Sequence, residues 1–96
     1  MFTLELTPIF RRDTKSYVRH GGSEERLQGV LRLLAEGKKI PASMHDHQLQ
    51  GKLRPLRELR VEPDWLLVYE KNGKQLSILC LWLTTHKKLS ERERSM

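Results

Sequence analysis

The chain has 96 residues, enough for one domain with a modest core and too few for a second lobe. Its 18 lysines and arginines outnumber 12 acidic residues, and the formal charge of +6 favours an anionic partner such as nucleic acid or an acidic protein. The single cysteine excludes an intramolecular disulfide and is typical of a reducing compartment. No apolar run is long enough to span a membrane, and the first residues lack a signal-peptide pattern, so we expect a cytoplasmic protein.

The first part of the sequence predicts a strand followed by a helix. Residues 2–6 alternate apolar and polar side chains, which indicates a short strand. Thr7 and Pro8 are typical of an N-cap and a first helical position, and the helix should cover 8–20. Its predicted inner stripe consists of Phe10, Thr14, Tyr17 and Val18, and a basic stripe beside it consists of Arg11, Lys15 and Arg19.

A second amphipathic helix is predicted over 23–36. Ser23 is a favoured N-cap residue, and Gly37 is a natural stop. The apolar side chains at helical spacing are Leu27, Val30, Leu31 and Leu34. This face should pack on a core, so the two helices together predict a helical layer over one face of a sheet.

Residues 38–52 show no periodicity and are expected to form a long loop, which in so small a domain suggests a function. His45 and His47 flank Asp46 in this segment. That arrangement invites a metal-site interpretation, but no third ligand is set by the spacing. We therefore expect neither a metal nor another cofactor.

The second half predicts an antiparallel meander with strands 53–62, 65–71 and 75–83. Asn72-Gly73 is a strong type I′ hairpin signal, and a two-residue turn there would pair Tyr69 with Leu76 and Leu67 with Ile78. The last strand is apolar on both faces, so it should be central, with Cys80 as a small buried hydrophobe. Residues 89–96 are expected to be a charged tail of a single domain, 1–96.

The Pro63-Asp64 turn connects two of these strands and places an acid beside Trp65. The pattern also fits an aspartate that hydrogen-bonds its own backbone. On the preceding strand, alternation puts Glu58, Arg60 and Glu62 on one face, so that Arg60 could hold a phosphate or simply face solvent. His86 leaves the last strand, and the predicted register lets it meet Asp64 only if the chain folds back.

Several separated segments together resemble the YafQ branch of the RelE/ParE toxin superfamily. They are His47-Gln48-Leu49-Gln50-Gly51, Arg57, Val61-Glu62-Pro63-Asp64-Trp65-Leu66-Leu67-Val68-Tyr69 and Thr85-His86. The order of elements also agrees, with a strand, two helices and a three-strand meander. The resemblance implies a RelE-like α+β fold with two helices on an antiparallel sheet.

The resemblance further implies an mRNA interferase, the toxin of a type II toxin–antitoxin pair. Such a protein acts as a ribosome-dependent, metal-independent endoribonuclease in the A site, through attack of the 2′-hydroxyl that leaves a 2′,3′-cyclic phosphate. The implied partners are a cognate antitoxin, mRNA on the ribosome with rRNA contacts, and operator DNA only through the antitoxin. The expected catalytic residues are His86, Asp64, His47 and Arg60. The expected substrate-binding residues are Arg57, Trp65, Lys87 and Lys88.

This chain departs from the YafQ pattern at two positions. Arg60 stands where the pattern has a histidine, and Ser90 stands where it has an aromatic residue after the final histidine. A loss of catalysis that leaves an RNA- or ribosome-binding module is therefore one alternative. A second alternative is a ParE-like toxin that inhibits DNA gyrase, which would not need the titratable set of His47, Asp64 and His86.

Overall fold

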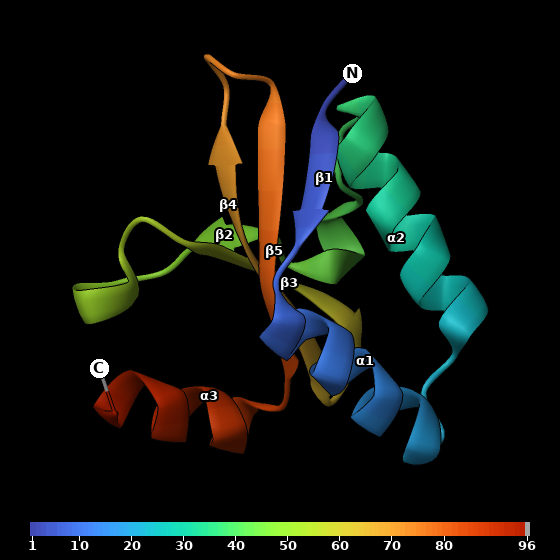
Figure 1. The fold of residues 1–96 in the computed structure, drawn as a ribbon, viewed down its shortest axis with the longest axis vertical. Coiled ribbons are helices and arrows are strands. Elements are labelled where there is room, and N and C mark those ends of the chain that lie inside the picture. The colour runs from blue at the N-terminus through green and yellow to red at the C-terminus, as the bar shows by residue number, and fades with distance from the viewer. Residues whose placement is uncertain (96) are drawn as a thin grey trace.

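The computed structural model describes residues 1–95, whose strands form one five-stranded sheet (Figure 1). The strands are β1 (Thr3–Leu6), β2 (His47–Gln48), β3 (Arg57–Glu62), β4 (Trp65–Asn72) and β5 (Ser77–Thr84). The helices are α1 (Pro8–Arg19), α2 (Glu24–Glu36) and α3 (His86–Arg94), with short 3-10 turns η1 (Ala42–Met44) and η2 (Gly51–Leu53). None of the helices in residues 1–95 is both long and apolar enough to cross a bilayer.

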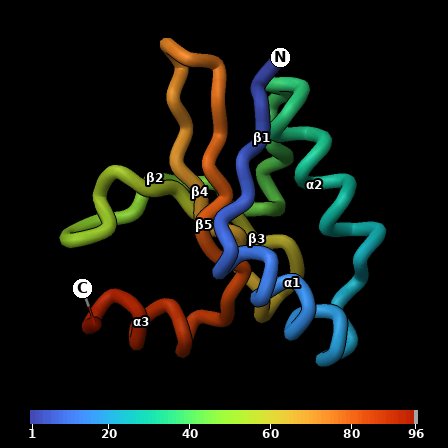
Figure 2. The backbone as a smooth tube through the Cα atoms, viewed as in Figure 1, coloured from blue at the N-terminus to red at the C-terminus, as the bar shows by residue number. Residues whose placement is uncertain are grey.

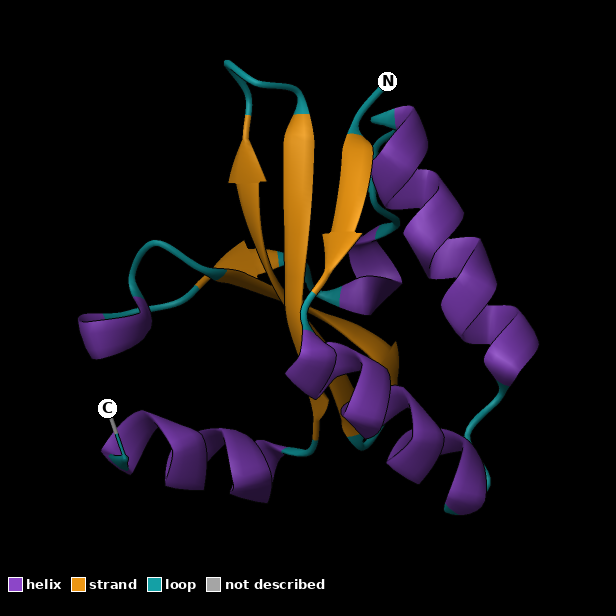
Figure 3. Ribbon diagram, viewed as in Figure 1, coloured by secondary structure: helices purple, strands orange, loops and turns teal. Residues whose placement is uncertain are grey.

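The sheet has the order β1-β5-β4-β3-β2, which places β5 inside the sheet, between β1 and β4 (Figure 3). Strands β3, β4 and β5 pair antiparallel, which confirms the predicted meander, and its last strand has a neighbour on each side. Strand β1 joins β5 in parallel, which makes the whole sheet mixed and corrects the expectation of a wholly antiparallel sheet. A parallel neighbour requires a long connection, and α1, α2 and the first meander strands supply it.

The two predicted helices form the expected layer and bury their apolar stripes against one face of the sheet. The Thr7 hydroxyl accepts the N–H of Phe10 (3.0 Å) and Ser23 caps α2 by accepting the N–H of Arg26 (3.1 Å). The main core includes Phe10, Tyr17, Leu27, Val30, Leu31, Leu34, Leu59, Leu67, Ile78, Cys80 and Leu83. Val18 was expected inside but is 41% exposed, because α1 turns the stripe of Phe10, Asp13 and Tyr17 inward instead.

The β4–β5 hairpin, the loop at the top of Figure 2, has a longer turn than the sequence predicts. The Asn72 side chain accepts the N–H groups of Lys74 (3.1 Å) and Gln75 (3.0 Å), and Leu76 adopts a left-handed conformation with φ of 51°. The turn therefore runs over 73–76 and pairs Asn72 with Ser77. The predicted pairing of Tyr69 with Leu76 is wrong, because the side chain of Asn72 caps a wider turn in place of the type I′ turn.

This register brings the end of β5 to the start of β4. Tyr69 pairs with Cys80, and an irregularity between Val68 and Tyr69 then places Thr84 opposite Leu66. Two residues beyond this pair lie Asp64, in the turn before β4, and His86, the first residue of α3. The separation that the sequence predicted between these two residues therefore arose from the wrong hairpin register.

A second irregularity, on β3, moves Glu62 off the face that it was expected to share with Arg60. The β3–β4 register shifts between Arg60 and Glu62, and Glu62 reaches the helical layer. Its carboxylate accepts the O–H of Tyr17 and the N–H of Ser23 (3.0 Å). A bulge places successive side chains on one face, which strict alternation does not anticipate. Glu62 thus connects the meander to the corner between α1 and α2.

The segment expected to be an irregular loop contains η1, η2 and the edge strand β2, and 53–56 is not part of a strand. Strand β2 pairs His47 with Glu58 and Gln48 with Arg57. A strand of two residues is too short to show an alternation of apolar and polar side chains, so the sequence does not predict this strand. The segment also covers the second face of the sheet with a small cluster formed by Leu53, Leu56 and Val68, against which Leu49, Leu81, Trp82 and Leu89 pack.

We expect Glu62→Gln to lower the free energy of unfolding by about 1 kcal/mol near neutral pH, measured by denaturant titration, because a charge-assisted hydrogen bond becomes a neutral one. The hydrogen bond from Tyr17 lowers the pKa of Glu62 in the folded state. Its stabilisation is therefore complete above the unfolded pKa of about 4.3 and is lost as the pH falls through the lower folded pKa.

The difference between the wild type and Glu62→Gln should accordingly shrink in acid. Glu70→Gln is the matched control, since Glu70 is exposed on β4. An undiminished difference at pH about 3 would show that the carboxylate charge of Glu62 is not what stabilises this contact.

Candidate functional site

Three buried polar atoms without a hydrogen-bond partner gather on the sheet face that α1 and α2 do not cover. Within residues 1–95 these atoms are Glu58 Oε2, Arg60 Nε and Thr84 Oγ1. The register places Glu58 opposite Val68, and it places Arg60 and Thr84 on either side of Leu66. Buried polar groups in folded proteins are nearly always paired, so such a cluster indicates a surface prepared for a ligand.

His47 lies at the β2 side of this face and contacts Glu58. Its Nε2 is 3.1 Å from Glu58 Oε1, and its Nδ1 is 2.6 Å from the carbonyl oxygen of His45. A carbonyl only accepts, so Nδ1 carries a proton. The segment before β3 thus folds back along the sheet and brings His47 opposite Glu58. Sequence reasoning missed Glu58, although it occupies the same strand face as Arg60.

Asp64 and His86 lie at the end of the same region, beyond the pair of Leu66 and Thr84. Both side chains are exposed, and among residues 1–95 the Asp64 carboxylate accepts no hydrogen bond. His86 is the first residue of α3, whose first turn also carries Lys87 and Lys88. A helix N-terminus and two lysines together favour a negatively charged group.

Two predicted substrate-binding residues point into the helical layer instead. The Trp65 ring packs edge-on against Tyr17, with centroids 5.2 Å apart. The Arg57 guanidinium donates to Asp46 Oδ2 (3.1 Å), and the Tyr69 hydroxyl donates to Asp46 Oδ1 (2.6 Å). The contact with Asp46 raises the pKa of Arg57. The structure therefore does not bring Arg57 together with Arg60, and it places Trp65 half-buried against the core.

A groove of about 300 Å³ continues from His47 toward the C-terminal helix. It is lined by His47, Gln48, Leu49, Gln50, Leu53, Leu89, Ser90 and Glu93. Ser90, where the family pattern has an aromatic residue, thus lies on the same surface as His47. The segment expected to be a charged tail is helical as far as Arg94, so the groove has a defined second wall.

The position of α3 depends on a buried carboxylate in α1. Arg92 donates to both oxygens of Asp13 (2.8 Å each), and Asp13 also accepts the N–H of Leu83 (3.0 Å). The Arg92 guanidinium lies over the Trp82 ring, 5.4 Å from its centroid. No α3 residue in the described chain is buried, so this contact and the packing of Leu89 hold the helix that carries His86.

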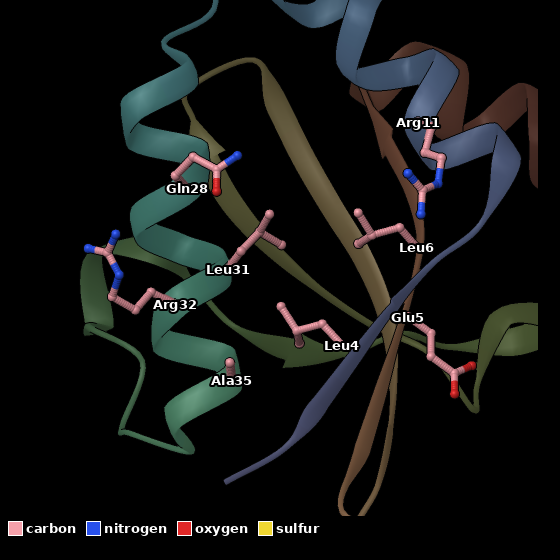
Figure 4. A pocket seen from close by; sticks show the side chains of 8 residues that line it. All are labelled: Leu4, Glu5, Leu6, Arg11, Gln28, Leu31, Arg32 and Ala35. Carbon is pink, nitrogen blue, oxygen red and sulfur yellow. The ribbon is translucent and has the colours of Figure 1, made fainter.

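A separate groove of about 730 Å³ opens between α2 and β1 (Figure 4). Its apolar lining consists of Leu4, Leu6, Leu31 and Ala35, and its polar lining consists of Glu5, Arg11, Gln28 and Arg32. In Figure 4, Leu31 and Leu6 extend into the gap from opposite sides, and Arg11 points toward it from α1. Among residues 1–95, no group of three or more His, Cys, Asp or Glu side chains is arranged to hold a metal ion.

This α+β arrangement is the RelE-like fold, and known proteins that share it have related sequences. The family model described as "Bacterial toxin of type II toxin-antitoxin system, YafQ" matches residues 2–91. The chain therefore belongs to the YafQ family of type II toxin–antitoxin toxins.

Individual relatives agree with this assignment. The mRNA interferase toxin YafQ of Escherichia coli K12 is 31% identical over 74 residues, which cover 76% of this chain and 80% of the relative. A metal-bound toxin from Helicobacter pylori has a TM-score of 0.84 at 31% identity, over 93% of this chain and 99% of that one. The toxin in the E. coli DinJ–YafQ complex has a TM-score of 0.83 at 27% identity, covering 93% of this chain and 98% of that one.

We expect Arg92→Ala to lower the free energy of unfolding by about 2 kcal/mol, because the Asp13 carboxylate would keep only one of its hydrogen-bond donors. Hydrogen exchange of α3 amides should rise more than that of α2 amides. Arg94→Ala, an exposed change on the same helix, is the control. Equal exchange in the wild type and Arg92→Ala would show that Asp13 does not hold α3.

Proposed function

We propose that this chain cleaves mRNA on the ribosome as the toxin of a cytoplasmic toxin–antitoxin pair. The observation that carries this proposal is the face on which Glu58, Arg60 and Thr84 present unpartnered polar atoms between His47 and His86. The name of the E. coli relative, an mRNA interferase toxin, supports it. The charge of +6 suits a polyanionic substrate.

The reaction is the attack of a ribose 2′-hydroxyl on the adjacent phosphate. The 2′-oxygen bonds to phosphorus and loses its proton to a base, while the 5′-oxygen leaves and takes a proton from an acid. The products are a 2′,3′-cyclic phosphate and a 5′-hydroxyl, and no metal is required. Catalysis needs a base, an acid and positive charge at the phosphate.

The site offers a residue for each of these roles. His86 is the principal proton-transfer residue, because imidazole is the side chain best suited to accept and donate a proton in a reaction near neutral pH. Asp64 acts as its counterpart or orients it, from the turn beside the start of α3. Arg60 neutralises the phosphate with the charge of its guanidinium group. His47 assists, with its ring oriented by the His45 carbonyl and by Glu58.

Substitutions should separate these roles in single-turnover cleavage on programmed ribosomes. His86→Ala should slow cleavage about 10²–10⁴-fold, the usual cost of losing a general acid or base. Arg60→Ala should slow the chemical step about 10²-fold at saturating ribosomes, because the developing charge loses a donor. Lys88→Ala should mainly weaken binding, and Lys38→Ala, an exposed change just after the C-terminus of α2, is the control.

Wild-type rates in His86→Ala would remove this mechanism. Failure of the wild-type protein itself to cleave mRNA would favour a non-nucleolytic toxin or a binding module.

We also propose that an acidic, amphipathic segment of the antitoxin occupies the groove between α2 and β1. The E. coli toxin of similar fold forms a complex with DinJ. Here the groove combines an apolar lining with Arg11 and Arg32, and Arg11 begins the basic stripe that continues through Lys15 and Arg19. Apolar side chains of the antitoxin would fill the gap while its carboxylates meet these arginines.

Association with the antitoxin encoded beside this chain should accordingly slow as ionic strength rises. Arg32→Glu should slow it about tenfold at low salt, whereas Lys74→Glu, the same charge change at the hairpin tip, should have little effect. Stopped-flow mixing or surface plasmon resonance would measure the association rates of both variants. If the association rate does not change with ionic strength and is the same for the two variants, the groove is not the electrostatic contact with the antitoxin.

A further inference from the structure

A small pocket lies between α1 and α3, directly beside the proposed catalytic end of the sheet. It has a volume of about 160 Å³, and its lining includes Trp65 and Thr85. These two residues are the chain neighbours of Asp64 and His86. The pocket therefore adjoins the place where the proposed reaction occurs, and neither the fold nor the proton-transfer steps require it.

The lining of the pocket combines the aromatic rings of Trp65 and His20 with a small number of other polar groups. Trp65 and Leu83 contribute apolar surface, and Ser16 and His20 line it from α1. Lys88 lines it from α3 and is exposed. The pocket thus offers stacking surface inside and a positive charge at its solvent side, which is the combination used to bind single-stranded nucleic acid.

The His20 ring has a defined orientation in this pocket. Its Nδ1 is 2.7 Å from the carbonyl oxygen of Ser16, one turn earlier in α1. A carbonyl only accepts, so Nδ1 carries the proton and Nε2 of the neutral ring is the acceptor that remains. An acceptor beside an aromatic ring can read the exocyclic amino group of a base.

Asp13 also lines the pocket, but its negative charge does not stand alone. Both of its oxygens accept hydrogen bonds from Arg92, and one also accepts the N–H of Leu83. The carboxylate therefore does not repel a phosphate that approaches Lys88. The remaining fixed charge at the pocket is positive.

We propose that this pocket takes one unstacked nucleobase of the mRNA, next to the scissile phosphate, and that His20 contributes to codon preference. The inference rests on the proposed cleavage activity and identifies a substrate subsite for it. The base lies against Trp65, its exocyclic amino group donates to His20 Nε2, and its backbone phosphate meets Lys88.

Two variants and a control test the pocket by single-turnover cleavage of ribosomes programmed with a set of A-site codons. His20→Ala removes the acceptor, and Ser16→Met fills the pocket with a residue that favours helix. Each should raise the half-saturating ribosome concentration about tenfold with little change in the maximal rate, and His20→Ala should also flatten the codon profile. Arg12→Ala, an exposed change on α1, should alter neither, and thermal unfolding checks that each variant folds.

Direct binding separates this inference from the proposed activity. In nuclear magnetic resonance titrations with the four nucleoside 5′-monophosphates, the His20 imidazole signals should shift, and Ser16→Met should abolish the shift. If the wild type cleaves mRNA but both pocket variants match it in saturation and codon profile, the pocket is not a subsite. If the wild type does not cleave mRNA, the proposed activity fails, and the titration alone decides whether the pocket binds a nucleotide. His20 signals that do not shift in the titration would overturn the inference.

Discussion

The Asn72 side chain sets the register on which the arrangement of the proposed site depends. By accepting the N–H groups of Lys74 and Gln75, it closes a turn wider than the dipeptide Asn72-Gly73 would make alone. The wider turn pairs Asn72 with Ser77, and the irregularity between Val68 and Tyr69 adds one further step, so that Thr84 faces Leu66. Because α3 starts one residue after β5, the same register brings His86 to the end of the sheet that carries the Asp64 turn. The side chain at one end of the hairpin and the irregularity in its middle thus decide which residues meet at the other end.

The two faces of the sheet have different physical characters. The face under α1 and α2 buries Leu59, Leu67 and Ile78 in a continuous core. The opposite face is covered only by a small cluster around Val68, and beside it stand Glu58 and Arg60 with unpartnered buried atoms. Stability resides mainly in the first face, so the second can tolerate polar groups that are not satisfied within the fold.

The two proposed binding surfaces lie on different parts of the molecule and use different elements. The antitoxin groove is formed by α2, β1 and Arg11 of α1, whereas the catalytic face and the nucleobase pocket depend on α3. Helix α3 buries no residue and is tied to α1 through Asp13. Since α1 contributes Arg11 to one surface and Asp13 to the other, it is the element through which binding at the groove could affect the catalytic end.

The sequence by itself determined α1, α2, their N-caps, the meander and the family, because these follow from local periodicity, capping chemistry and motif spacing. By resemblance it also predicted His47, Arg60, Asp64 and His86 as catalytic residues, and these roles stay a prediction. Only the tertiary structure decided four other features. They are the hairpin register, the contact of Glu62 with Tyr17, the short strand that contains His47 and the ion pair of Arg57 with Asp46. Each depends on a side chain meeting a distant group or on a bulge that alternation does not show. Such contacts form only when the whole chain is packed, so no local pattern records them.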